Sequence, residues 1–433
     1  MNDNCKLAFV LPRSFFSADH HDNTRSGKAK GFKVALIWDL DKVNPLFRVP
    51  SCVFFVEKHK KDKSIQVNNL DGKIFSGKLP EHNCNLKIAS DLITENDVKY
   101  FYIKQGNASA ISTRKAKSNQ LENPYKKNFK QGATIVPRCF YFVELNQEIP
   151  PDFNDRILNI KTSEAIEADA KKPWKGLKFN GKIESKFLFR TALAKSILPF
   201  ALYNPDLVVL PVLIETDHSN NKKIKLLESD ELRREGYLNA ARWFKNVENT
   251  WQLLRTEKNQ NISSVNYLNW QNKLTSQKLE AKYLVTYNMS GKDAYATVIK
   301  RSEIDFDFIV DYTTFRIELF NEKEAYYLES ILNSTAPNLL MKDFQAKGLF
   351  GARHVSKKIL DIYFPRYDDT NETHRQLAEL GREAHQRAKE FLEKNPPQKE
   401  LSATRLGRLR MEIKKHLAKE MQEIDKLIEK ILR

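Results

Sequence analysis

The segment from Gln345 to Lys358 combines the residue types that contact phosphates and base edges. It holds five basic or imidazole side chains around two glycines. Glycine lets a backbone approach phosphate closely, lysine neutralises phosphate charge, and arginine can bind guanine through two hydrogen bonds. We therefore expect this segment to contact nucleic acid, with a solvated basic turn as the alternative. The predicted contact residues are Gln345, Lys347, Gly348, Arg353, His354, Lys357 and Lys358.

Other cations are weaker candidates for phosphate contacts. Arg13 and Ser14 follow a short apolar run, while Lys28 and Lys30 lie in a polar segment. Arg138 belongs to a stretch in which cations alternate with aromatic residues, as they do along a nucleic-acid groove. A charged, half-buried strand edge explains that stretch equally well. Its other members are Lys126, Lys127, Lys130, Tyr125, Phe129 and Phe140.

The overall charge supports a polyanionic partner. Lys and Arg number 72 against 55 for Asp and Glu, which gives a net charge of +17. Contacts with phosphate release counterions, so this surplus favours nucleic acid over a merely basic cytosolic protein. The chain has 433 residues, of which 41% are hydrophobic. This composition excludes a disordered chain, and the length predicts two or three domains.

A metal-dependent nuclease is a rival hypothesis. Asp152 after Pro151 and the sequence Glu184-Ser185-Lys186 loosely fit a pattern in which carboxylates hold magnesium and lysine orients water. Glu-x-Lys arises easily by chance in a chain that is 29% charged, and Asp152 lies in a proline-rich turn. The nuclease is therefore the least favoured hypothesis, and we predict no metal site.

The cysteines and the hydropathy pattern indicate a reduced cytoplasmic protein. The four cysteines are isolated along the chain, so they form neither a zinc pattern nor a disulfide framework. No run of about 18 apolar residues is present, which excludes a membrane-spanning helix. The apolar run 7–11 is too short for a signal peptide.

Three apolar segments near the N-terminus, 6–11, 33–38 and 51–56, predict buried sheet strands. The polar segment 14–31 between the first two predicts a surface loop or a short helix. Residues 59–365 predict an α+β region without repeats. Its candidate strands are 134–144, 207–214, 283–288, 294–300, 308–316 and 360–364, and its candidate helices are 228–255 and 322–333.

The C-terminal part predicts helices. One spans 371–394 and stops at Asn395-Pro396-Pro397, because proline cannot continue a helix. A second runs from 402 to the end with apolar residues at steps of three and four. An antiparallel hairpin and a helix that packs on a partner fit this stripe equally well. The predicted domains are therefore 1–58, 59–365 and 366–433.

Several dispersed segments share a family pattern. Near the N-terminus they are 7–16, Ile37-Trp38-Asp39-Leu40, Pro45-Leu46-Phe47 and Val49-Pro50-Ser51-Cys52-Val53-Phe54-Phe55. Further along they are 283–291, Phe344-Gln345-Ala346-Lys347-Gly348-Leu349-Phe350-Gly351-Ala352-Arg353-His354 and 423–428. Together they resemble the C-terminal part of prokaryotic adenine-specific (N-6) DNA methyltransferases of the restriction-modification type.

This resemblance implies a remnant of a Rossmann-like methyltransferase sheet, a mixed α+β target recognition domain and a helical hairpin. The family transfers a methyl group from S-adenosylmethionine to adenine flipped out of duplex DNA. It normally carries a glycine-rich donor turn and an Asn/Asp-Pro-Pro-aromatic motif. The chain has only 14 glycines and no G-x-G, and Gln398 follows its one Asn-Pro-Pro. We predict that this chain alone neither binds the donor nor catalyses the transfer.

One active-site residue survives in the resemblance. Phe47 matches an aromatic residue that packs against the flipped base, although a core phenylalanine is the simpler alternative. The first hypothesis is thus a DNA-recognition portion whose catalytic half is encoded separately or lost. The second is a fragment of a complete methyltransferase, and the third is the nuclease.

Overall fold

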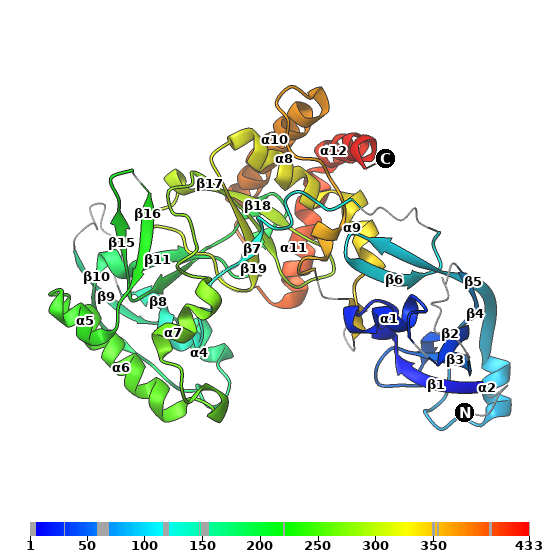
Figure 1. Cartoon of the computed structure of the whole chain (residues 1–433). Helices are drawn as coiled ribbons and strands as arrows, with labels where there is room; N and C mark the ends of the chain where they lie inside the picture. The colour runs from blue at the N-terminus through cyan, green and yellow to red at the C-terminus, as the bar shows by residue number, and fades with distance from the viewer. Residues whose placement is uncertain are drawn as a thin grey trace.

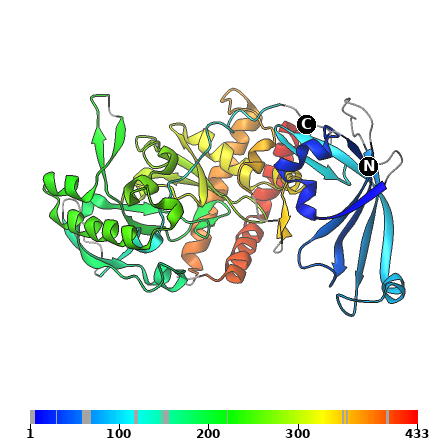
Figure 2. The ribbon, with the colours of Figure 1, turned by 60° about the horizontal axis from the view of Figure 1, so that its bottom comes forward.

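The computed structural model describes residues 6–432 except 30, 59–68, 116–120, 147, 149–155, 220, 349–350, 353–354 and 398–400. Within these ranges the chain forms three larger sheets that lie in a row (Figure 1). The N-terminal sheet lies at one end, and a sheet-and-helix lobe lies at the other. A helix-covered sheet joins them, and a second view keeps this order (Figure 2). The expected mixed α/β and α+β class is confirmed.

The N-terminal sheet curls and is mostly antiparallel, with one parallel pair, β2 and β4, among its described strands. Gly72 permits the curl, because a Cβ atom there would lie 2.4 Å from the Tyr100 ring and 2.6 Å from the Ile37 carbonyl oxygen. The sheet continues past residue 58, so the domain boundary expected there falls inside it. Its spatial order is β1 (Lys6–Pro12), β3 (Ser51–Lys58), β2 (Phe32–Asn44), β4 (Asn69–Lys78), β5 (Ile93–Gln105) and β6 (Ala108–Ser112).

The first strand differs from its prediction. β1 forms as expected, but it is an edge strand rather than a buried one. Leu7, Phe9 and Val10 are 39%, 48% and 58% exposed. An apolar run forms a buried strand only where neighbouring elements cover it. Here β3 is the one strand of the described chain that pairs with β1.

Short helical turns fill the segment between β1 and β2, as predicted. They are η1 (Arg13–Phe16), η2 (Asp19–His21) and α1 (Asp22–Arg25). Arg25 is buried and fixes them, since its guanidinium donates to the carbonyl oxygens of Phe15 and Ala18 and to the Ser109 hydroxyl. This segment is thereby bound to β6.

The opposite lobe packs two helices on a five-stranded sheet. Buried Trp243 and Trp251 of α6 (Leu238–Leu254) join its core. The predicted helix 228–255 is broken, because Gly236 with φ 88° separates α5 (Ser229–Arg234) from α6. The sheet order is β10 (Asn180–Glu184), β9 (Ile157–Thr162), β8 (Phe142–Leu145), β14 (Asp206–Val209) and β11 (Leu188–Thr191). Smaller elements are α3 (Arg138–Tyr141), α4 (Glu164–Asp169), η3 (Ser185–Phe187), β15 (Val212–Thr216), β16 (Lys222–Leu226), η4 (Glu257–Asn259), α7 (Ser264–Leu268) and η5 (Trp270–Asn272).

The central sheet is covered by α8 (Glu322–Asn333), which matches its predicted bounds. Its order is β18 (Ala296–Lys300), β17 (Tyr283–Asn288), β19 (Thr314–Leu319) and β7 (Lys130–Gln131), and the hairpin β12 (Ile197–Leu198) and β13 (Ala201–Leu202) lies beside it. Helix α8 satisfies the open edge of β18 with buried side chains. The Asn333 amide both donates to and accepts from the Ala296 backbone, and Glu329 accepts from the Val298 N–H at 2.8 Å. An unpaired sheet edge is thus covered without another strand.

The C-terminal helices pack into the central core. Helix α10 (Glu372–Lys394) begins at its Asn371 cap and stops before the prolines, as predicted. The second predicted helix is divided at Leu417 into α11 (Ala403–His416) and α12 (Ala418–Ile431). Their apolar stripe, with Leu409, Ile413 and Ile424, is buried in the same core as α8. Packing within the chain therefore accounts for the stripe.

Four further strand predictions are wrong in part or in full. Segment 134–144 contains α3 and only the start of β8, and 207–214 is divided between β14 and β15. Segment 308–316 is largely a loop before β19, and 360–364 begins in the short helix η7 (Lys358–Asp361). Among the described residues, no helix has the length and apolar character needed to cross a membrane.

Candidate nucleic-acid interface

Two loops meet at one end of the N-terminal sheet. The Arg13 N–H, just after β1, donates to the Pro50 carbonyl oxygen at 2.7 Å, which joins η1 to the 45–50 loop. That loop carries Phe47, whose side chain is 44% exposed. Phe47 is therefore not a core residue, and an exposed ring is available for stacking.

Arg13 and Ser14 lie in this joined region. The Arg13 Nε donates to both Asp39 carboxylate oxygens at 2.9 and 3.0 Å, and its guanidinium lies 4.9 Å from the Phe16 ring centroid. These contacts fix the arginine while its side chain stays 22% exposed. Arg13 is oriented by the fold, and a second carboxylate, Asp41, lies 3.7 Å from its Nε.

The predicted 345–358 segment comes to the same place. It contains the hairpin β20 (Lys347–Gly348) and β21 (Gly351–Ala352), and β20 contacts η1. Figure 2 shows this hairpin, coloured yellow-orange, beside the N-terminal sheet. Lys358 forms an ion pair with Asp19 of η2 at 2.6 Å, so the far end of the segment also binds the helical turns between β1 and β2. Arg353, His354 and Lys30 lie outside the described residues.

Two members of the segment have very different surroundings. Gln345 is 3% exposed and donates to the Lys292 carbonyl oxygen, while its Oε1 has no partner among the described residues, so Gln345 holds the segment in place from inside. Lys357 is exposed beside a cavity of about 190 Å³ that Lys126, Lys358 and Asp361 also line. Burial, and then the charge of Lys126, lowers the pKa of Lys357. Asp361 pairs with Lys126 and Asp19 pairs with Lys358, so the cavity keeps a surplus of one positive charge that a phosphate could neutralise.

Arg138 and Lys28 lie apart from one another. Lys28 is exposed shortly after α1, on the N-terminal part of the chain. Arg138 lies in α3 of the opposite lobe, 5.7 Å from the Phe142 ring centroid. The aromatic residues interleaved with the lysines there, Tyr125, Phe129 and Phe140, are buried. The buried-edge explanation of that stretch is thus the better one.

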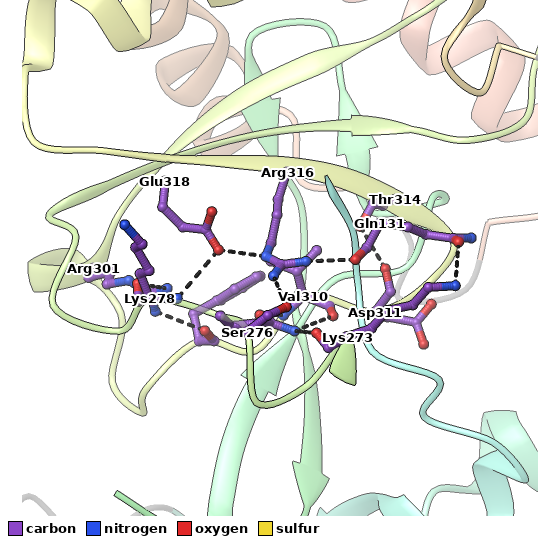
Figure 3. Close-up of polar contacts among 12 residues, drawn as sticks. Gln131, Lys273, Ser276, Lys278, Arg301, Val310, Asp311, Thr314, Arg316 and Glu318 are labelled. Carbon is purple, nitrogen blue, oxygen red and sulfur yellow. Dashed lines mark hydrogen bonds and ion pairs between the residues drawn. The ribbon is translucent and has the colours of Figure 1, made fainter. Parts of the chain in front are cut away.

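A buried charged network, which the sequence pattern missed, lies beneath the central sheet (Figure 3). The Arg316 side chain is fully buried and donates to Glu318 at 2.7 Å, to the Gln131 carbonyl oxygen and to the Ser276 hydroxyl. Lys273 donates to the Gln131 side chain at 2.9 Å. The network fastens the 273–278 loop and β7 to β19. Arg316 and Glu318 are two residues apart on β19, so their side chains share one face of the strand. This pair of charges on one face was the sequence signal that could have revealed the network.

Asp311 lies beside this network and is buried. Burial raises the pKa of Asp311 to about 6, although Arg138 and hydrogen bonds from Thr313 act in the opposite sense. The pKa of Asp311 is higher in the folded chain than its value of about 3.9 in the unfolded chain. The contribution of this carboxyl to the free energy of unfolding is therefore complete below about pH 4 and is lost as the pH rises through about 6.

We expect Asp311→Asn to remove part of the pH dependence of stability. Between pH 5 and 7.5 the parent should lose about 1–2 kcal/mol more than this variant, because the amide cannot ionise. Urea unfolding at both pH values measures the difference. Asp369→Asn, an exposed change, is the control and should follow the parent. Equal pH slopes in parent and Asp311→Asn would show that Asp311 does not titrate in this range.

Two residues of the nuclease pattern, Glu184 and Lys186, make other contacts. Glu184 accepts from the backbone N–H groups of Asn239 and Ala240 and so caps α6. Lys186 lies 5.0 Å from the Tyr237 ring centroid. Asp152 is outside the described residues, and in the part of the chain that is described no three His, Cys, Asp or Glu side chains are grouped to hold a metal ion.

Comparisons with known proteins give a likeness of fold. No family model and no curated protein matches the chain. It is similar to the Type IIL restriction-modification enzyme MmeI in complex with DNA, at 13% identity and a TM-score of 0.50 over 99% of this chain and 47% of that one. Two further structures match more weakly. The type IIG restriction endonuclease BpuSI has 11% identity and a TM-score of 0.30 over 100% of this chain and 47% of that one. The ATP-dependent Type ISP restriction-modification enzyme LlaBIII bound to DNA has 10% identity and a TM-score of 0.34 over 89% of this chain and 25% of that one. The chain spans about half the length of the first two.

Proposed function

We propose that this chain binds double-stranded DNA as the sequence-recognition portion of a restriction-modification methyltransferase, in the cytoplasm. The observation that carries the proposal is the convergence of η1, the Phe47 loop and the 345–358 segment at one sheet end. An oriented arginine, an exposed aromatic ring and a glycine-bearing basic hairpin are the groups that bind phosphate and an unstacked base. The similarity in fold to a DNA-bound restriction-modification enzyme supports this assignment.

The finer proposal concerns the reaction. The enzymes that this chain resembles in sequence methylate adenine at N-6 with S-adenosylmethionine. We assign this chain to the recognition portion of such an enzyme. Donor binding needs backbone amides on a glycine-rich turn between a strand and a helix. The closest glycines, Gly348 and Gly351, instead lie on the β20–β21 hairpin. The described residues therefore do not fit the donor.

We expect the isolated chain not to bind S-adenosylmethionine. Titration calorimetry should give no stoichiometric heat at donor concentrations in the micromolar range, because the sequence has no G-x-G turn to present backbone amides to the donor. The same preparation should bind a 30-bp duplex, which confirms that it is folded. Micromolar, stoichiometric donor binding would contradict the assignment.

The catalytic half is proposed as the partner of β1. The outer edge of this strand has no described neighbour, and the exposed Phe9 and Val10 would be covered by a further strand. A mostly apolar cavity of about 380 Å³, lined by Leu7, Phe15 and Phe54 among others, lies on one face of this edge strand. A strand of a methyltransferase sheet would pair there, whether it belongs to a second chain or to an upstream part of a longer one.

The test is co-purification with the product of the neighbouring upstream gene, followed by a methylation assay. We expect a complex that transfers methyl groups to adenine in duplex DNA, whereas neither component does so alone. An upstream reading frame that is continuous with this chain and carries both motifs would favour the complete enzyme instead. A complex that binds no duplex DNA would overturn the proposal.

A further inference from the structure

A tight turn with strained backbone follows α7. Its hydrogen bonds run from the Asn272 N–H to the Asn269 carbonyl oxygen at 2.8 Å and from the Lys273 N–H to the Trp270 carbonyl oxygen at 3.3 Å. Gln271 and Asn272 both have φ 57°, in the left-handed region. Glycine, asparagine or aspartate usually fills such positions, because other side chains crowd the backbone there. The chain keeps a glutamine where glycine would be unstrained.

The base of the turn is rigid. The Asn269 side-chain oxygen accepts from the N–H groups of Leu274 and Thr275 at 3.2 and 3.1 Å. Leu268 and Leu274, on either side, are fully buried. The turn is therefore held in one conformation by its flanks, and a rigid support lowers the entropy lost on binding.

The tip of the turn is exposed. Trp270 is 45% exposed, and Gln271 and Asn272 are exposed as well. The side-chain amides of Gln271 and Asn272 are not packed in the core. Burial of these side chains therefore adds no stability that could offset the backbone strain. Strained backbone of this kind is concentrated at functional sites, where it presents side chains for binding.

The surroundings of the turn suit an anion. Lys273 donates to the Gln131 side chain, as Figure 3 shows, and Lys130 is exposed next to it. Within the described residues, neither lysine has an ion pair with a carboxylate. The nearby Glu318 is neutralised by Arg316. The exposed groups are thus amides, an indole and ammonium groups.

We propose that the Trp270–Asn272 turn reads base edges in duplex DNA. Gln271 and Asn272 donate and accept hydrogen bonds as an adenine edge requires, and Trp270 packs against a base or sugar at the same step. Lys130 and Lys273 neutralise the flanking phosphates. This inference rests on the proposed DNA-binding function and assigns a second contact surface, on the central part of the chain.

The test is selection from a pool of random-sequence 30-bp duplexes by the full chain and its variants. Gln271→Gly keeps the left-handed turn and relieves its strain, so the variant should be as heat-stable as the parent or more so. It should nevertheless lose preference at one or two base pairs. Trp270→Ala should bind the duplex preferred by the parent at least tenfold more weakly, whereas Trp270→Phe should retain much of the affinity.

Fluorescence provides an independent readout. DNA should quench tryptophan emission in the parent, and Trp270→Phe should remove more of this change than Trp38→Phe or Trp174→Phe, because Trp243 and Trp251 are buried and Trp38 and Trp174 are only partly exposed. If the parent binds duplex but all three variants select the same sequence with the same affinity, the turn inference is wrong and the proposed function stands. If the parent binds no duplex, both are wrong.

Discussion

Replacing Arg316 with methionine is expected to lower the free energy of unfolding by about 3–5 kcal/mol. The arginine is fully buried, and its loss leaves the Glu318 carboxylate, only 8% exposed, without its cation. It also leaves the Gln131 carbonyl oxygen without the guanidinium donor that lies 2.6 Å away. A buried charge without a partner costs far more than the net value of the original pair.

Two controls separate this effect from simple loss of charge. In Arg316→Met with Glu318→Leu, both charges are absent, so most of the lost stability should return. Arg382→Met breaks an exposed pair with Glu379 on α10 and should cost less than about 1 kcal/mol. Urea unfolding followed by tryptophan emission measures all three. If Arg316→Met costs no more than Arg382→Met, the network of Figure 3 does not hold the loop to β19.

Helices with complete local signals could be predicted from the sequence. Helix α8 has an asparagine cap at Asn321, acidic residues in its first turn and an apolar face, and it forms at its predicted bounds. Helix α10 similarly begins after Asn371 and stops before Pro396. In such elements the local sequence and the tertiary packing favour the same structure.

Strand predictions failed where side chains take the place of a neighbouring strand. In 308–316, the Gln277 amide both donates to and accepts from the Val310 backbone, at 3.0 and 2.8 Å. In 360–364, the Asn123 amide donates to the Ile362 carbonyl oxygen. Residues 308–313 make only two isolated bridges, Phe308 with Arg190 and Asp311 with Ala133, and 360–364 joins no described strand, although both runs are largely buried. Periodicity cannot reveal a partner that is a single distant side chain.

The failed 134–144 prediction has a different cause. Pro137 offers no N–H for a ladder, and the chain makes the helical turn α3 directly after it. The apolar residues Cys139 and Phe140 are buried nonetheless, and the Trp243 indole donates to the Phe140 carbonyl oxygen. Apolar character correctly predicted burial there but not the backbone conformation.

The candidate interface was predicted only in pieces. Composition identified the basic, glycine-bearing segment 345–358 and, separately, Arg13 with Ser14. Their meeting depends on the contact between β20 and η1 and on the ion pair between Lys358 and Asp19, which span more than 300 residues. The Trp270–Asn272 turn could not be predicted, because its distinguishing feature is the left-handed backbone at Gln271 and Asn272, which the residue types do not reveal.

Two alanine substitutions in the 345–358 segment should weaken DNA binding in different ways. Lys357→Ala removes a cation crowded by Lys126, so affinity for all duplexes should fall and the salt dependence should flatten by about one unit. Arg353→Ala should instead cost about 1–3 kcal/mol on the preferred duplex and little on others, if the arginine binds a base edge.

The matched control is Lys430→Ala on α12, an exposed lysine that carries the same charge away from the segment. Titrations of a selected and a scrambled duplex at several salt concentrations separate the two effects, because a phosphate contact changes the salt slope for both duplexes whereas a base contact changes their affinity ratio. If both variants behave as Lys430→Ala does, the segment is a solvated turn. DNA would then be recognised elsewhere, and the Trp270–Asn272 turn would become the first surface to test.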